Sequence, residues 1–534
     1  LLFSLLPLSI FVLLLSVIPD VSSGGAFSSS LAWMPQMGVY LSFYLDSLSL
    51  LLSLLISGIG VLVFYYAGGY FQGHAHLGRF YLYFISFMAS MLGVVLADNV
   101  ITLFVFWELT SITSFFLIGF YNKDKQSRVS AIRALVITGG GGLALFAGFL
   151  MLGQYYGTYE LSVMRNLGAI DVNDGLYVPI VVLILIGCFT KSAQFPFHFW
   201  LPNAMSAPSP VSAYLHSSTM VKAGIFLLAR LFPILGGGVL WTQSLSLVGG
   251  VTALVGGFLA LTNSDIKKVL AYSTVSALGL LIALLGTGTE YGIVAFVLFV
   301  CAHAMYKGAL FLLAGNIDHE SGTRNISELG GLFSVMRFSG VFTGLSALAM
   351  IGLFPFFSFI AKEMIFESGI QASKNSVYWQ CLFFVVGALF TCIALIVFIR
   401  PFFGNLKVKK EQVHDAPFSM LFGPGLLSCF GLLSVLFLNY LGTSLLLPAS
   451  GAIFGEAVQQ DIVLWHGFNQ AFVLSLCSIA VGVLLYFIWL SFSNKIFNIA
   501  KSFPLGIEAG YHGLLVIGDA SSSFLTKTFQ NGRL

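Results

Sequence analysis

Long runs of apolar residues alternate with short polar segments along the whole chain. Runs of this length cross a hydrocarbon layer of about 30 Å as single α-helices. We therefore expect an all-α, multi-pass membrane protein with fourteen spanning helices, and a weaker fifteenth candidate near 511–527. The expected spans are 2–18, 39–64, 79–97, 99–120, 129–153, 177–205, 208–233, 245–262, 269–286, 291–315, 335–368, 379–400, 418–441 and 470–492.

The composition agrees with this pattern. Of the 534 residues, 58% are hydrophobic and only 8% are charged, values that exclude an ordinary soluble domain. The net charge of +3 gives no indication of nucleic-acid binding. The six cysteines form no Cys-x-x-Cys pair, and we expect neither a metal nor another cofactor. The glycine run at 139–142 lacks the Lys-Ser/Thr of a phosphate-binding loop, so we attribute it to close helix packing.

The beginning of the chain allows two interpretations. The first apolar run resembles the core of a signal peptide, but no basic residues precede it, so we interpret it as a spanning helix. The chain begins at Leu1 rather than at Met, and we expect it to be part of a longer protein.

Basic residues are divided unequally between the two sets of loops that fourteen spans create. Starting from a cytoplasmic N-terminus, one set of loops holds fifteen lysines and arginines, and the other set with its helix ends holds three. The first set is Arg79, Lys123, Lys125, Arg128, Arg133, Lys267, Lys268, Arg324, Arg337, Arg400, Lys407, Lys409, Lys410, Lys495 and Lys501, and the second is Arg165, Arg230 and Lys374. This asymmetry predicts that the first set faces the cytoplasm.

Two of the expected spans contain a proline at a central position. The sixth reads KSAQFPFHFWLP around Pro196, and the eleventh reads IGLFPFFSFIAKE around Pro355. Proline removes a backbone donor, and lipid cannot satisfy the groups that a broken helix leaves. Two broken helices that cross the membrane in opposite directions indicate inverted repeats, as in ion transporters.

Ionisable side chains within the spans are the main candidates for function. An ionised group at mid-membrane costs at least about 2.5–3.5 kcal/mol, so each requires a partner or a role. Glu108 and the lysines at 191, 222, 307 and 362 lie on five different spans. A line of such groups would form a proton or cation pathway, in which the charge of Glu108 is set by a nearby lysine. The alternative for Glu108 is a fixed structural ion pair.

Further polar groups accompany these five. His303 lies four residues before Lys307, so the two share a helix face. His216 precedes Lys222 on the seventh span, where a hydrogen-bonded packing role is an equal alternative. Glu363 follows Lys362 after the second break, and we expect one of this pair to be embedded in the membrane while the other meets water.

The segments that contain several of these ionisable residues resemble a known protein family. DNVITLFVFWELTSITSFFLIGFY, TKSAQFPFHFWLPNAMSAPSPVSAYLHSSTMVKAG and DIKKVLAYSTVSALG are similar to the antiporter-like membrane subunits that respiratory complex I shares with Mrp-type cation/proton antiporters. NIDHESGTRNISELGGL at 316–332 and LDSLSLLLSLLISGIGVLV at 45–63 resemble the A subunits of the Mrp antiporters more closely. The resemblance covers nearly the whole chain.

The resemblance implies an organisation and a set of roles. The fold would be two inverted five-helix repeats at 79–233 and 245–400, between N-terminal helices at 1–78 and C-terminal helices at 401–534. By the resemblance the proton relay would consist of Glu108, Lys191, Lys222, His303, Lys307 and Lys362, and the spans themselves add His216 and Glu363 as candidates. Phe299 stands where many relatives have a second histidine, which leaves the central relay with fewer groups.

These observations favour one function over several alternatives. We expect a proton-translocating component of a multisubunit Na⁺(cation)/H⁺ antiporter in a bacterial cell membrane, not an enzyme by itself. Its partners would be the smaller membrane subunits, of the B to G type, together with protons, monovalent cations and lipid. The alternatives are a distal proton-pumping component of a complex I-type quinone oxidoreductase, the membrane half of an inorganic-carbon uptake pair, and a purely structural scaffold.

Overall fold

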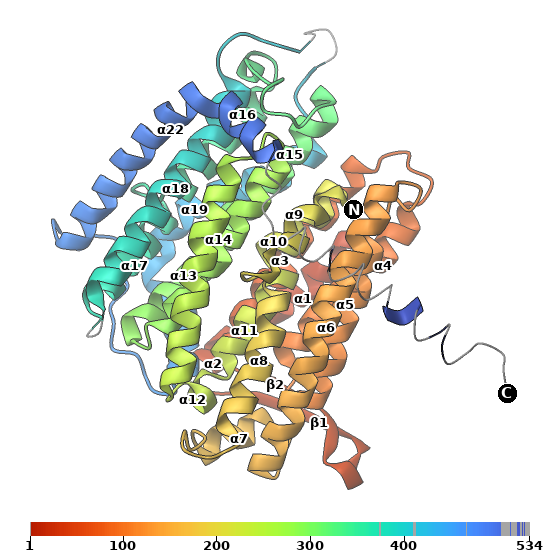
Figure 1. The fold of residues 1–534 in the computed structure, drawn as a ribbon, viewed down its shortest axis with the longest axis vertical. Coiled ribbons are helices and arrows are strands. Elements are labelled where there is room, and N and C mark those ends of the chain that lie inside the picture. The colour runs from red at the N-terminus through yellow and green to blue at the C-terminus, as the bar shows by residue number, and fades with distance from the viewer. Residues whose placement is uncertain are drawn as a thin grey trace.

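The computed structural model describes residues 2–372, 375–408, 413–465 and 467–502, together with 513, 521–523, 526 and 528. The candidate segment near 511–527 and the basic residues Lys374, Lys409 and Lys410 therefore fall largely outside the described residues. Within the described part, ten helices are long and apolar enough to span a membrane, and three shorter apolar helices accompany them. The chain is a multi-pass helical membrane protein (Figure 1).

The helices follow one another with short connections. Their bounds are α1 Leu5–Ser16, α2 Ile18–Ser22, α3 Ser47–Tyr70, α4 Leu77–Leu96, α5 Val100–Ile118, α6 Lys125–Tyr156, α7 Leu161–Leu167, α8 Tyr177–Lys191, α9 Trp200–Asn203, α10 Ser209–Ser217, α11 Ala223–Arg230, α12 Phe232–Leu235, α13 Val239–Leu261, α14 Ile266–Gly286, α15 Glu290–Ser321, α16 Arg337–Ile351, α17 Phe357–Ile370, α18 Ser376–Phe402, α19 Phe418–Leu433, α20 Leu438–Leu441, α21 Leu447–Phe454 and α22 Gln470–Ser502.

Short polar residues start the central helices. Asn99 accepts from the backbone N–H of Ile101 at the start of α5, and Asp124 accepts from that of Ser127 in α6. Asp265 caps α14 in the same way through the N–H of Lys267. Such caps satisfy backbone donors at the end of a span, where the helix itself has no acceptor to offer.

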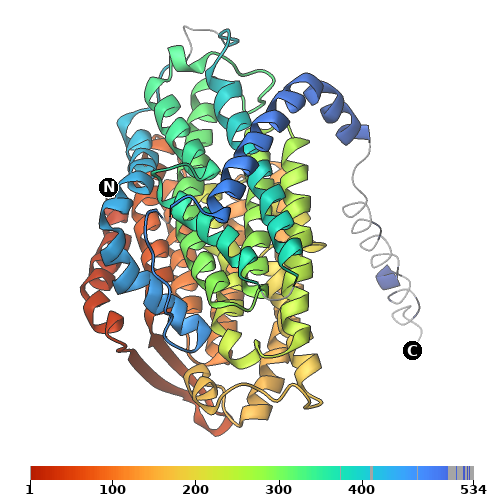
Figure 2. The ribbon, with the colours of Figure 1, turned by 90° about the vertical axis from the view of Figure 1, so that its left-hand side faces the viewer.

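The expected span at 39–64 is only partly helical. Residues Val39–Leu45 form a strand, β2, which pairs antiparallel with β1, Phe27–Met34. Figure 2 shows this hairpin at one end of the helix bundle. Aromatic and branched side chains make β2 a good strand, and Asp46 then ends it and caps α3 through the N–H of Ser49. The prediction of a helix in this apolar run is therefore confirmed for α3, but the first seven residues of the run form strand β2.

The expected helix at 208–233 is also wrong as a single span. It divides into α10 and α11, which are separated by Ser218, Thr219 and a 3₁₀ turn at Met220–Lys222. The Thr219 hydroxyl donates to the carbonyl of Tyr214 at 2.6 Å. Hydroxyl side chains compete in this way for backbone groups, so three consecutive hydroxyl residues at 217–219 favour a break.

The loops gather at two ends of the bundle. At one end Arg324 pairs with Asp265 at 2.8 Å, and Lys407 donates to the carbonyl of Ser327 at 2.9 Å. At the other end the N–H of Ile170 donates to the carbonyl of Ile234. This grouping agrees with the alternating order of spans on which the count of loop charges depends.

Helix α15 lies at the centre of the second half, whereas α6 is only partly buried in the first half. α6 packs against α5 and α8, whereas α15 packs against α10, α14, α16, α17 and α19. The candidate membrane window of α15 is completely buried inside the protein. α22 packs along α18 and α17 at the outside of the second half (Figure 1).

Candidate functional site

Glu108 and Lys191 meet where the first broken helix ends. Lys191 is the last residue of α8, and its Nζ donates to the carbonyl of Trp107 at 3.0 Å and to Ser111 Oγ at 2.8 Å, both on α5. Glu108 Oε1 is buried and has no hydrogen-bond partner among the described residues. The lysine therefore binds α5 on either side of Glu108 in the sequence without being fixed to its carboxylate.

The break after Lys191 reaches the next lysine. The chain leaves α8 at Lys191 and becomes helical again at Phe197, after a cis bond before Pro196. Ser192 Oγ donates to the carbonyl of Val221 at 2.7 Å, one residue before Lys222. The two interrupted segments are thus in direct contact.

Lys222 connects this region to the central helix α15. Its Nζ donates to the carbonyl of Val300 at 2.9 Å. His303 lies one turn further along α15, and both its ring nitrogens are buried without a partner among the described residues. Lys222 reaches α15 at Val300, and Lys307 follows His303 by four residues on the same helix, so the imidazole lies on the part of α15 that both lysines approach.

Lys307 continues the line on the same helix. Its Nζ donates to Ser273 Oγ on α14 at 2.6 Å. His303 and Lys307 share a face as their spacing predicts, but within the described residues no hydrogen bond joins them. His216 is also buried, without a hydrogen-bond partner for its ring nitrogens among the described residues, and its ring packs 5.6 Å from that of Phe311 on α15.

Lys362 is the last lysine of the series, just after the second break. α16 ends at Ile351, whose carbonyl accepts from Lys362 Nζ at 3.1 Å, and a cis bond precedes Pro355. A cavity of about 40 Å³ is lined by Lys362, Tyr306 and further residues of α15 to α18. That volume suffices for a water molecule beside Lys362.

The expectation that one of Lys362 and Glu363 meets water at the membrane surface is wrong. The two side chains are 9% and 4% exposed, respectively. Both lie on α17, which packs between α15, α18 and α22. The long side chain of Lys362 bends back to its own broken helix, so it does not extend towards the aqueous boundary.

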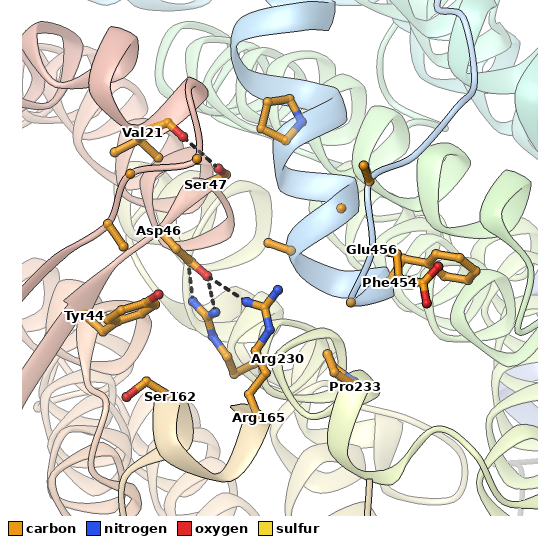
Figure 3. Close-up of a pocket in the computed structure, with 18 of the residues that line it drawn as sticks. Val21, Tyr44, Asp46, Ser47, Ser162, Arg165, Arg230, Pro233, Phe454 and Glu456 are labelled. Atoms are coloured by element: carbon orange, nitrogen blue, oxygen red, sulfur yellow. Dashed lines mark hydrogen bonds and ion pairs between the residues drawn. The ribbon is translucent and has the colours of Figure 1, made fainter. Parts of the chain in front are cut away.

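A polar cluster at one end of the bundle was missed in the sequence. Figure 3 shows the carboxylate of Asp46 between the guanidinium groups of Arg230 and Arg165. Arg230 makes two hydrogen bonds to Asp46, at 2.5 and 2.8 Å, and Arg165 is 3.8 Å away. Burial raises the pKa of Asp46, but Arg230 outweighs burial and lowers it to about 2.

This cluster lines an open cavity of about 1230 Å³. Its walls come from the segment before α3, from α7 and from residues near α21. Two of the three basic residues that the sequence assigns to the sparsely charged loops meet here. A search for the acidic partner of those two arginines would have found Asp46, the residue at the start of the second apolar helix.

Known families match most of the chain. Residues 97–391 match the family model described as NADH:quinone oxidoreductase/Mrp antiporter, TM, and residues 33–81 match that of NADH-Ubiquinone oxidoreductase (complex I), chain 5 N-terminus. The A subunit of the Na(+)/H(+) antiporter of Alkalihalophilus pseudofirmus is 37% identical over 99% of this chain and 69% of its own length. The A1 subunit of the Na(+)/H(+) antiporter of Staphylococcus aureus strain MRSA252 is 39% identical over 90% of this chain and 63% of its own length.

A solved structure agrees with these sequence relatives. One protein of the Mrp complex from Dietzia sp. DQ12-45-1b superposes with a TM-score of 0.84 at 34% identity, covering 98% of this chain and 57% of that chain. The present chain thus spans between 57% and 69% of the length of these proteins. The chain therefore belongs to the NADH:quinone oxidoreductase/Mrp antiporter family of membrane subunits, and within that family to the A subunits of the Mrp-type antiporters.

Proposed function

We propose that this chain moves protons within a multisubunit Na⁺/H⁺ antiporter. The observation that carries the proposal is the line of ionisable groups that begins at the half-buried Glu108 and continues through four buried lysines to Lys362. Each of the four lysines hydrogen-bonds to a neighbouring segment, and contacts through Ser192 and Val300 join the successive segments. The relatives are named as Na(+)/H(+) antiporter subunits, which supports Na⁺ as the exchanged cation.

The partners of the four lysines suit proton transfer. Lys191, Lys222, Lys307 and Lys362 donate to carbonyl and hydroxyl oxygens. A buried amine with neutral partners is not held in its charged form by a fixed counter-ion, and burial favours the neutral amine. A proton that reaches one lysine raises the cost of charge on the next, so charge can pass along the line in steps.

Glu108 would begin the line. Its carboxylate and Lys191 interact electrostatically without a fixed bond on Oε1. A proton or cation that neutralises Glu108 would weaken the attraction on Lys191. Lys191 would then release its proton towards the break and Lys222.

We also propose the two inverted repeats. α6 and α15 each have 32 residues, and α8 and α16 each have 15. Backbone bridges join Asn99 to Glu160 in the first half and Asp265 to Asn325 in the second. The matched order supports repeats at 79–233 and 245–400, each with one helix broken at a proline and its own lysines.

The chain would act as part of a transporter and not as an enzyme. We propose that its partners are the other membrane subunits of the antiporter complex, of the B to G type, and that the complex lies in a bacterial plasma membrane. Purification of the assembled complex, with identification of the copurified subunits, tests this assignment. Copurifying iron–sulfur proteins would instead support the quinone-oxidoreductase alternative.

Replacement of Glu108 tests the mechanism. The whole complex carrying Glu108→Gln, in membrane vesicles, should lose Na⁺-driven proton movement measured with a pH-sensitive dye. Glu367→Gln on α17 is the matched control, because Glu367 lies outside the line and accepts from Gln371 at 2.7 Å, a bond that glutamine can also accept. Wild-type exchange by Glu108→Gln would refute the relay.

A further inference from the structure

Two of the four glycines at 139–142 do more than let helices approach. α6 lies against both α5 and α8, and its Gly141 and Gly142 face the two partners of the relay. A methyl group on Gly142 would overlap the carboxylate of Glu108, with Cδ at 3.0 Å. A methyl group on Gly141 would overlap Thr190, with its Cβ at 2.7 Å. Thr190 directly precedes Lys191.

The carboxylate of Glu108 therefore rests on the bare backbone of α6. Oε1 is buried there and has no hydrogen-bond partner among the described residues, so contact with Gly142 limits where it can sit. Oε2 is also near the helix, because a methyl group on Gly139 would lie 3.7 Å from it. Gly140 differs from these neighbours: it is exposed, and a methyl group there would have no atom within 4 Å.

We propose that Gly142 is a positioning residue for Glu108, and that the Gly141–Gly142 step sets the separation between its carboxylate and Lys191. The inference rests on the proposed relay. Gly142 leaves room for the carboxylate of Glu108 on α5, and Gly141 leaves room for the end of α8, which carries Lys191. Because glycine has no side chain, α6 can approach both Glu108 and the end of α8 closely, and these two segments carry the first two groups of the line.

The two glycines differ in what a substitution would displace. Alanine at 142 meets the free end of a flexible side chain, so Glu108 can rotate away while the helices stay in place. Alanine at 141 meets Thr190 as far as its Cβ, so α8 itself would have to move. Gly142→Ala is therefore the substitution that changes the carboxylate position with the least change in fold.

The test uses the whole complex in vesicles and compares Gly142→Ala with the control Gly140→Ala. Misplacing a reacting group by about 1 Å lowers rates by about 10-fold to 100-fold. We expect a loss of this size in the maximal exchange rate of Gly142→Ala, with an unchanged KM for Na⁺ and a normal amount of assembled complex. Gly140→Ala should match the wild type, and a wild-type rate for Gly142→Ala would overturn the inference.

A shorter acid gives a second, independent measurement. Glu108→Asp should be slow by itself, because its carboxylate is withdrawn from α6. Combined with Gly142→Ala it should lose much less than the product of the two single losses, since neighbouring sites are not additive. Purely multiplicative losses would overturn the inference. If Gly142→Ala prevents assembly, restored assembly in the double variant supports the contact and continued failure refutes it.

A parallel Glu108→Gln sample separates this inference from the function on which it rests. Normal exchange by Glu108→Gln would refute the proposed relay itself. An inactive Glu108→Gln beside a fully active Gly142→Ala would leave the relay in place and refute only the role of the glycine.

Discussion

Lys307 and Ser273 are joined by a 2.6 Å hydrogen bond between α15 and α14. A hydroxyl can both donate and accept, so it can serve the charged and the neutral lysine alike. Ser273→Ala should slow proton-coupled Na⁺ exchange by up to about tenfold, because a neutral hydrogen bond contributes about 0.5–1.5 kcal/mol. Ser273→Thr should retain most activity. Ser276→Ala is the control on the same helix, since Ser276 donates only to the carbonyl of Ala253; an equal loss there would assign the effect to packing.

Lys222 gives a prediction about proton release. Lys222→Ala should abolish exchange in vesicles, and Lys222→Arg should be nearly as inactive, because a guanidinium keeps its proton. Lys268→Arg, close to the loop end of α14, should exchange normally and controls for the substitution itself. A substantial rate for Lys222→Arg would mean that Lys222 supplies a fixed charge and does not pass a proton.

The sequence revealed the line of groups because charge is so rare in the spans. Glu108 and four lysines stand out against apolar neighbours, and the two prolines mark the breaks that the structure contains. What could not be predicted depends on contacts between distant segments. The pairing of β1 with β2 turned the first residues of an apolar run into a strand. The hydroxyl residues before Lys222 broke a helix that hydrophobicity alone would continue.

The glycine run at 139–142 is another place where the sequence does not predict a contact between distant segments. Glycines at 139–142 predict a close approach of helices, which is correct for Gly141 against α8. The sequence does not say that Gly142 meets the carboxylate of Glu108, because that contact depends on the rotation of α6 between two neighbours. Asp46 was missed for a related reason: its two arginines lie on α7 and at the end of α11, more than 100 residues away along the chain.

The Asp46–Arg230 pair should contribute strongly to stability. Asp46→Asn leaves a buried guanidinium without its counter-ion, a change that destabilises by about 3–5 kcal/mol. We expect a lower temperature of thermal unfolding for the detergent-purified complex, followed through this chain. Asp171→Asn, in an exposed loop, is the control. Asp46→Leu combined with Arg230→Met should recover part of the loss, and an unchanged unfolding temperature for Asp46→Asn would contradict the role of the pair.

The same pair predicts how stability changes with pH. The pKa of Asp46 is lowered from 3.8 to about 2, chiefly because Arg230 outweighs the opposing effect of burial. The unfolded chain therefore binds this proton more readily than the folded chain. A shift of this size corresponds to about 2 kcal/mol, which is fully present above about pH 5 and is lost as the pH falls from about 4 through 2. The difference in unfolding free energy between the wild type and Asp46→Asn should stay constant above pH 5 and shrink below pH 4, and a pH-independent difference would contradict this account.

His303 and His216 should respond differently to the same substitution. His303 lies on α15 one turn from Val300, the acceptor of Lys222, and one turn from Lys307, whereas His216 packs its ring against Phe311. His303→Ala should lower the maximal exchange rate by about 100-fold to 10,000-fold, the range for loss of a proton-transfer group, with normal assembly. His216→Ala should mainly lower stability, because it leaves a gap in a packed interior, and the rate per assembled complex should fall by less than about threefold, which corresponds to under about 0.7 kcal/mol in the barrier. Equal losses of rate in the two variants would place His216 in the pathway beside His303.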